Sequence, residues 1–214
     1  MRIFRLIILQ SICLSFRKGG GALGACAFYV IMVTLFTFAM GTQAISQYAT
    51  AIMCVSMLLA IITTLPLLFE RYYEDGTLEQ FLLQPVLLEM LVCAKICGQF
   101  LSQIIPILAV SPLLAIMAGL SYQQTLHALL VLILAAPTMV ALGAIGASLT
   151  IGSKRGGLLQ ALVVTPFYIP VLIFASATGQ NSGNSGILFL AGLMFISFPL
   201  ACYVCAGLIR ASDD

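Results

Sequence analysis

Three long stretches of the chain contain no aspartate, glutamate, lysine or arginine, and they cover residues 19–69, 96–153 and 156–209. Each stretch is too long for one membrane-spanning helix of about 20 residues and about long enough for two. Each also has a central cluster of glycine, serine, asparagine or glutamine, which is typical of turns. The pattern therefore predicts three helical hairpins, hence six transmembrane helices, in a single domain covering residues 1–214.

Composition places the chain in the membrane-protein class. Hydrophobic residues make up 62% of it, charged residues only 7%, and the mean hydropathy is +1.15. A soluble domain carries roughly 25% charged residues, so this chain lacks the polar surface that water requires. We expect an all-α integral membrane protein. The net charge of +2 is too small to indicate a nucleic-acid partner.

The positive charges predict the orientation in the membrane. All of them fall at a chain end or between the predicted hairpins, and the hairpin turns carry none: Arg2, Arg5, Arg17, Lys18, Arg71, Lys95, Lys154, Arg155 and Arg210. Short loops rich in lysine and arginine face the cytoplasm. Both termini are therefore predicted to be cytoplasmic.

Two segments outside the spans are predicted to lie on the membrane surface. Residues 1–18 form a basic amphipathic helix; a signal peptide is the alternative, but no small-residue cleavage motif follows the short apolar run. Residues 70–89 hold six of the sixteen charged side chains and show helical spacing of apolar positions beyond Gly76. Thr77 and Gln80 have the spacing of a helix-capping box. A solvated loop is the alternative interpretation of this second segment.

Prolines and small residues recur within the predicted spans. We expect the prolines to interrupt or kink the helices, at Pro106, Pro112, Pro137, Pro166, Pro170 and Pro199. Gly143 with Ala147, and Ala144 with Ser148, have the four-residue spacing that favours close helix contact. A broken-helix ion site is the alternative, disfavoured because no carboxylate lies within a predicted span.

The residues able to carry chemistry are few. Cys93 and Cys97 are four residues apart, and Cys202 and Cys205 form a CxxC pair, but neither haem attachment nor a zinc site is completed, so no metal site is predicted. These thiols are expected to be small buried apolar groups, with a redox role as the alternative. His127, the single histidine, is a weak candidate for contact with haem. ATPase and hydrolase motifs are absent, which predicts a non-enzyme whose energy comes from a partner.

Three runs of sequence carry a resemblance to a known family. They are ERYYEDGTLEQFLLQP at 70–85, SPLLAIMAGL at 111–120 and GSKRGGLLQALVVTPFYIPVLIFA at 152–175. With the amino-terminal MRIFR and the overall length, they resemble the B protein of the cytochrome c maturation system, a haem exporter membrane subunit. The resemblance implies a six-span, permease-type subunit of an ABC transporter in the bacterial inner membrane. The transported or released species would be haem, or a haem-loaded chaperone.

The resemblance also implies partners. These are a separate ABC ATPase that binds ATP, a haem-handling membrane subunit, a small membrane subunit and a periplasmic haem chaperone. A cytoplasmic element must then contact the ATPase, and the acidic segment suits this role through Glu70, Arg71, Glu74, Asp75, Gly76, Thr77, Leu78, Glu79 and Gln80. Lys154 and Arg155 are expected to make a secondary contact. The alternatives are a non-conducting scaffold, the permease of another small-substrate ABC exporter, or a channel, which the lack of ionisable residues in the spans disfavours.

The six-span arrangement predicts which positions an impermeant thiol reagent reaches from outside the cell. In a background lacking the seven native cysteines, Gln43→Cys, Gln123→Cys and Asn181→Cys should be labelled. Glu74→Cys and Lys154→Cys should be protected until the membrane is permeabilised. Labelling of Glu74→Cys in intact cells would contradict the predicted orientation.

Overall fold

The computed structural model describes residues 21–65, 88–150, 156–180 and 184–211. These residues form six α-helices: α2 (Gly21–Met40), α3 (Thr42–Thr64), α6 (Leu88–Met117), α7 (Tyr122–Leu149), α8 (Gly156–Gln180) and α9 (Asn184–Ala211). The prediction of an all-α, six-span protein is confirmed. The predicted helix at 1–18 lies outside the described residues, as does the acidic segment except for Leu88 and Glu89, which begin α6.

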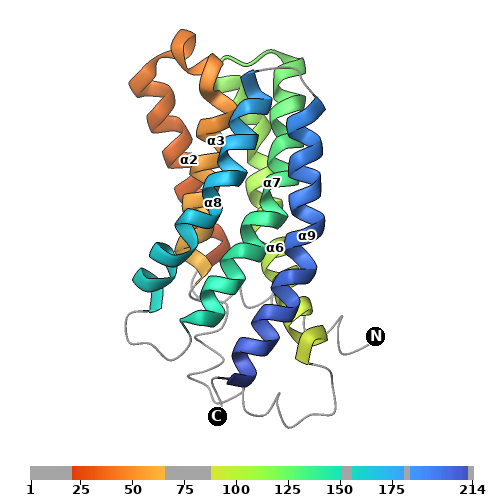
Figure 1. The fold of residues 1–214 in the computed structure, drawn as a ribbon. Coiled ribbons are helices and arrows are strands. Elements are labelled where there is room, and N and C mark those ends of the chain that lie inside the picture. Colours follow the sequence, from red (N-terminus) through yellow and green to blue (C-terminus); the bar gives the residue numbers. More distant parts are fainter. Residues whose placement is uncertain (1–20, 66–87, 151–155, 181–183, 212–214) are drawn as a thin grey trace.

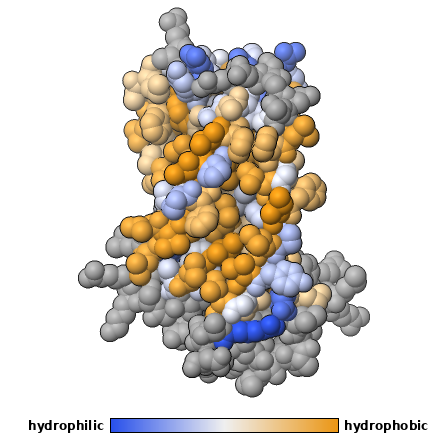
Figure 2. Space-filling view, viewed as in Figure 1, coloured by the Kyte–Doolittle hydropathy of each residue, from blue (hydrophilic) through white to orange (hydrophobic). Residues whose placement is uncertain are grey.

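The six helices lie side by side in one bundle (Figure 1). All are long and apolar enough to cross a membrane. Apolar side chains cover the flank of the bundle between its two more polar ends (Figure 2). We call the end that carries Glu89 and Arg210 the charged end, and the end that carries the α2–α3 and α6–α7 connections the turn end. The helices therefore expose to lipid the surface that their composition predicts.

Both connections described at the turn end depend on a glycine with positive φ. Gly41, at 75°, separates α2 from α3, and Gly119, at 81°, follows α6. At Gly119 the backbone N–H groups of Gly119 and Leu120 donate to the carbonyls of Ile116 and Ala115, which is a Schellman termination. Ser121 and Gln124 then form a reciprocal capping box that starts α7. These tight connections make each helix pair antiparallel.

Helix α7 lies at the centre of the bundle. Of its most apolar 18 residues 67% are buried, against 22% in α2 and in α9. Small residues on α7 allow the neighbouring helices to approach it closely. A Cβ added at Gly143 would overlap a methyl group of Leu65, the residue that follows α3, and would stand 2.7 Å from the hydroxyl of Tyr168 in α8. One added at Gly146 would overlap Cγ2 of Val164 in α8. The predicted close packing of α7 is confirmed at Gly143, and the structure adds Gly146.

The prediction that prolines interrupt the helices was wrong. α6 continues through Pro106 and Pro112, α8 through Pro166 and Pro170, and α7 and α9 each through one proline. Proline removes a backbone hydrogen bond but leaves the rest of the helix intact, and in lipid an unravelled backbone costs more than one lost bond. The prolines therefore lie within uninterrupted helices.

The contact between α7 and α8 predicts a stability effect at Gly146. Gly146→Ala should destabilise the bundle by about 1–3 kcal/mol, because the new methyl group overlaps Val164. The second change Val164→Ala should restore much of that loss. Gly192→Ala is the matched control, since nothing lies within 4 Å of its added Cβ. Thermal unfolding in detergent measures all three, and equal melting temperatures for Gly146→Ala and Gly192→Ala would contradict the described contact.

Candidate functional site

The residues predicted to contact an ATPase lie outside the described part of the chain. This applies to all nine named positions between Glu70 and Gln80, and to Lys154 and Arg155. Their assignment stays a prediction. The structure does describe where the acidic segment joins the bundle. It lies between Leu65, at the end of α3, and Leu88, at the start of α6.

An ion pair connects two helices at the charged end. Nη2 of Arg210, in the last turn of α9, lies 2.9 Å from Oε1 of Glu89, in the first turn of α6. Each charge also has the sign that the dipole of its own helix terminus favours. The side chains are 57% and 27% exposed, so solvent screens the pair and it contributes at most about 1 kcal/mol. This contact joins α9 to the helix that follows the acidic segment.

Lys95 is not between hairpins, as we expected from its charge. It lies in the second turn of α6 and is only 2% exposed. Gln99 and Gln103 follow at four-residue spacing, so all three side chains share one face of the helix. The interpretation that the spans lack ionisable residues is therefore wrong at Lys95. The polar four-residue repeat was the sequence signal that would have identified this buried face.

Hydrogen bonds from this face connect α6 to α3. Gln103 is fully buried, and its Nε2 donates to the carbonyl of Ala60 at 3.1 Å. Gln99 donates to Oε1 of Gln103, also at 3.1 Å. In lipid, an amide group has no water molecules with which it can form hydrogen bonds. Such contacts between helices therefore fix the register of one helix against the other, and each stabilises the pair by about 0.6–1.7 kcal/mol. α3 and α6, which flank the acidic segment, are thus held together in the core.

Tyrosines make the corresponding contacts elsewhere in the bundle. The hydroxyl of Tyr168 in α8 donates to the carbonyl of Met139 in α7 at 3.0 Å. The hydroxyl of Tyr29 in α2 lies 3.0 Å from Oγ of Ser111 in α6, which itself donates to the carbonyl of Ile107. Both tyrosines are fully buried. Each hydrogen bond satisfies a polar group that burial would otherwise leave unpaired.

His127 is half-buried near the start of α7, at the turn end. It is therefore about the length of the bundle away from Glu89 and Arg210. The suggestion that it contacts haem stays a prediction. The structure does not bring it together with the other candidate residues.

The cysteines that seemed to form two separate pairs meet between α6 and α9. Cys93 of α6 lies close to both Cys97 of the same helix and Cys202 of α9. Cys202 and Cys205 are buried, while Cys93 and Cys97 are half-buried, and none of the four forms a disulfide. Among the described residues, no group of three or more His, Cys, Asp or Glu side chains is arranged to hold a metal ion. Sequence spacing alone does not reveal this meeting, because it depends on helix packing.

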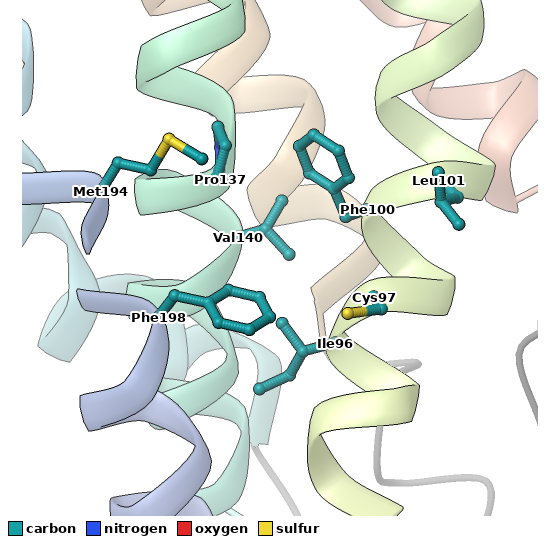
Figure 3. A pocket seen from close by; sticks show the side chains of 8 residues that line it. All are labelled: Ile96, Cys97, Phe100, Leu101, Pro137, Val140, Met194 and Phe198. Carbon is teal, nitrogen blue, oxygen red and sulfur yellow. The ribbon is translucent and has the colours of Figure 1, made fainter. Parts of the chain in front are cut away.

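An apolar groove of about 320 Å³ lies beside these thiols, between α6, α7 and α9 (Figure 3). Its walls are almost entirely carbon and sulfur, and they are formed by Ile96, Cys97, Phe100, Leu101, Pro137, Val140, Met194 and Phe198. Most of these residues are only half-buried, so the groove is open on one side. Sequence reasoning missed it, because its residues come from three helices and differ little from ordinary lipid-facing ones.

Comparison with known proteins shows to which family the chain belongs. The sequence profile of the CcmB protein family matches residues 1–212. The chain belongs to the CcmB protein family. Heme exporter protein B of Pseudomonas aeruginosa is 36% identical to it over 217 residues, covering 98% of this chain and 97% of the relative. Those of Haemophilus influenzae and Escherichia coli are 33% and 37% identical, each over 99% of this chain and over 99% and 97% of the relative.

The packing of the CxxC pair predicts that it is dispensable in this member of the CcmB family. Cys202→Ala with Cys205→Ala removes two buried sulfur atoms that no described metal-binding group uses. We expect the amount of chain in the membrane and the level of mature cytochrome c to stay near normal, as measured by immunoblot and haem staining. Loss of maturation at an unchanged protein level would instead indicate a redox role for the pair.

Proposed function

We propose that the chain is the permease-type membrane subunit of an ABC transporter complex that serves cytochrome c maturation. The observation that supports this most is the similarity, over nearly the whole length, to three proteins named Heme exporter protein B. The six apolar helices fit a membrane subunit of a haem-export system. The complex works in the bacterial inner membrane, with both termini of this chain in the cytoplasm. Haem, or a haem-loaded chaperone, is what the complex exports or releases.

In this proposal the chain is not itself an enzyme. A separate ABC ATPase binds and hydrolyses ATP, while a haem-handling membrane subunit, a small membrane subunit and a periplasmic haem chaperone complete the assembly. The part of the acidic segment from Glu70 to Gln80 fits a cleft of the ATPase and moves with it. Lys154 and Arg155 make a second, weaker contact.

The described helices suggest how such motion reaches the core. The segment is attached to α3 at Leu65 and to α6 at Leu88, and Gln103 hydrogen-bonds these two helices together. Leu65 also packs against Gly143 of the central helix α7. A displacement of the segment therefore moves α3 and α6 as a unit and presses on α7. Between α6 and α9, in contrast, the described polar contact at the charged end is a solvent-exposed ion pair.

The proposal predicts that reversing the acidic face uncouples the ATPase without unfolding the spans. Glu74→Lys with Asp75→Lys places like charge against a basic partner surface, and desolvated charges that lose their partners cost several kcal/mol. Single changes are expected to be hard to detect, since exposed pairs contribute about 0.2–1 kcal/mol. We expect a normal amount of chain in the membrane, weak co-purification of the ATPase and loss of mature cytochrome c.

The matched control reverses the other loop, by Lys154→Glu with Arg155→Glu. It should reduce ATPase co-purification less than the Glu74/Asp75 variant does. Should the Glu74/Asp75 variant keep both its ATPase and its maturation activity, the acidic segment is only a loop and the contact lies elsewhere.

A further inference from the structure

Two sulfur atoms lie on opposite walls of the groove between α6, α7 and α9. Cys97 projects from α6 and Met194 from α9, and both side chains are half-buried (Figure 3). Thiolate and thioether sulfur are soft ligands, and both serve as axial ligands of haem iron. A porphyrin supplies the equatorial nitrogens itself. One or two protein sulfur atoms therefore suffice, although no larger metal-binding cluster is present among the described residues.

The remaining walls suit a flat, aromatic ligand. Phe100 and Phe198 project into the groove from α6 and α9, and Pro137 and Val140 of α7 form its floor (Figure 3). Aromatic rings favour stacking on another π-system. The volume of about 320 Å³ holds part of a porphyrin, and the open side leaves room for the rest.

An ion pair lies toward one end of the groove, at the charged end of the bundle. Glu89 and Ile96 are seven residues apart, so they share a face of α6, and the ion pair with Arg210 lies below the groove along that face. Cys97 is eight residues beyond Glu89, which places it about 12 Å along the helix. The Arg210 side chain is 57% exposed. A ligand with an apolar body and carboxylate groups can bury the body and direct the carboxylates toward this guanidinium.

We propose that this groove is a haem-binding site, with Cys97 as the ligand of the ferric iron. The proposal rests on the proposed function, in which haem is the species handled by the complex. The porphyrin lies between Phe100 and Phe198, and its propionates point to Arg210. On binding, an iron–sulfur bond forms and the Cys97 thiol releases its proton to water. An acyl chain of a lipid would fit the apolar walls, but it would use neither the sulfur atoms nor Arg210.

Titration of the full-length chain in phosphatidylcholine nanodiscs tests the site. The probes are ferric protoporphyrin IX and the same porphyrin without metal, followed by optical absorbance and electron paramagnetic resonance. We expect ferric haem to bind with a thiolate-ligated signature. Cys97→Ser should abolish that signature and weaken ferric haem binding at least tenfold, yet leave binding of the metal-free porphyrin nearly unchanged. Cys26→Ser, which removes a half-buried thiol of α2 outside the groove, should change neither.

Two further variants separate the parts of the site. Val140→Phe fills the groove and should weaken both porphyrins, while Arg210→Gln should weaken both by several-fold because it acts on the carboxylates. Melting temperatures establish whether each variant is folded, and the Cys97→Ser result stands without Val140→Phe. Unchanged ferric haem binding in Cys97→Ser would overturn the proposal, as would a tightly held phospholipid that excludes haem. The Glu74/Asp75 variant should bind haem normally, so failure of this site and failure of ATPase coupling are distinguishable.

Discussion

The close approach of α7 to its neighbours is the constraint on which the rest of the bundle depends. In lipid, helices are not driven together by the hydrophobic effect, so packing and hydrogen bonds must hold them. At Gly143 and Gly146 the missing side chains leave space that Leu65, Tyr168 and Val164 fill. Tyr168 also donates to the carbonyl of Met139, so one side chain both packs against α7 and fixes its register with α8. The position of α7 therefore determines where α3 and α8 can lie.

The contacts of α6 differ strongly from one side of the helix to the other. Toward α3 and α2 it makes buried hydrogen bonds through Gln103 and Ser111, which have no competition from water. Toward α9, at the charged end, it relies on an exposed ion pair and on cysteine thiols, both weak partners. The described polar contacts along the α6–α9 boundary are therefore individually weak. The groove lies along that same boundary.

Sequence reasoning predicted the fold well, because charge-free stretches and turn residues directly reflect what a membrane tolerates. It also predicted the packing face of α7, since small residues at four-residue spacing have few other uses in a span. It failed at Lys95, because an argument from hydropathy takes every charged residue as the end of a span. The bundle instead buries the Lys95 side chain within α6. It also predicted that prolines interrupt the helices, whereas the helices continue through them. The groove and the meeting of Cys93 with Cys202 depend on which helices are neighbours, and no local pattern specifies that.

The two proposed sites are linked by α6. This helix begins where the acidic segment ends, and eight residues beyond Glu89 it presents Cys97 to the groove. If motion of the ATPase shifts α6 against α9, the distance between the two walls changes, and with it the affinity for a ligand held between them. Coupling of this kind is reciprocal: a ligand that favours one position of α6 must alter nucleotide-dependent binding of the ATPase by the same factor. In the proposed motion α3 moves with α6, and the same shift changes the contact between Leu65 and Gly143 of the central helix.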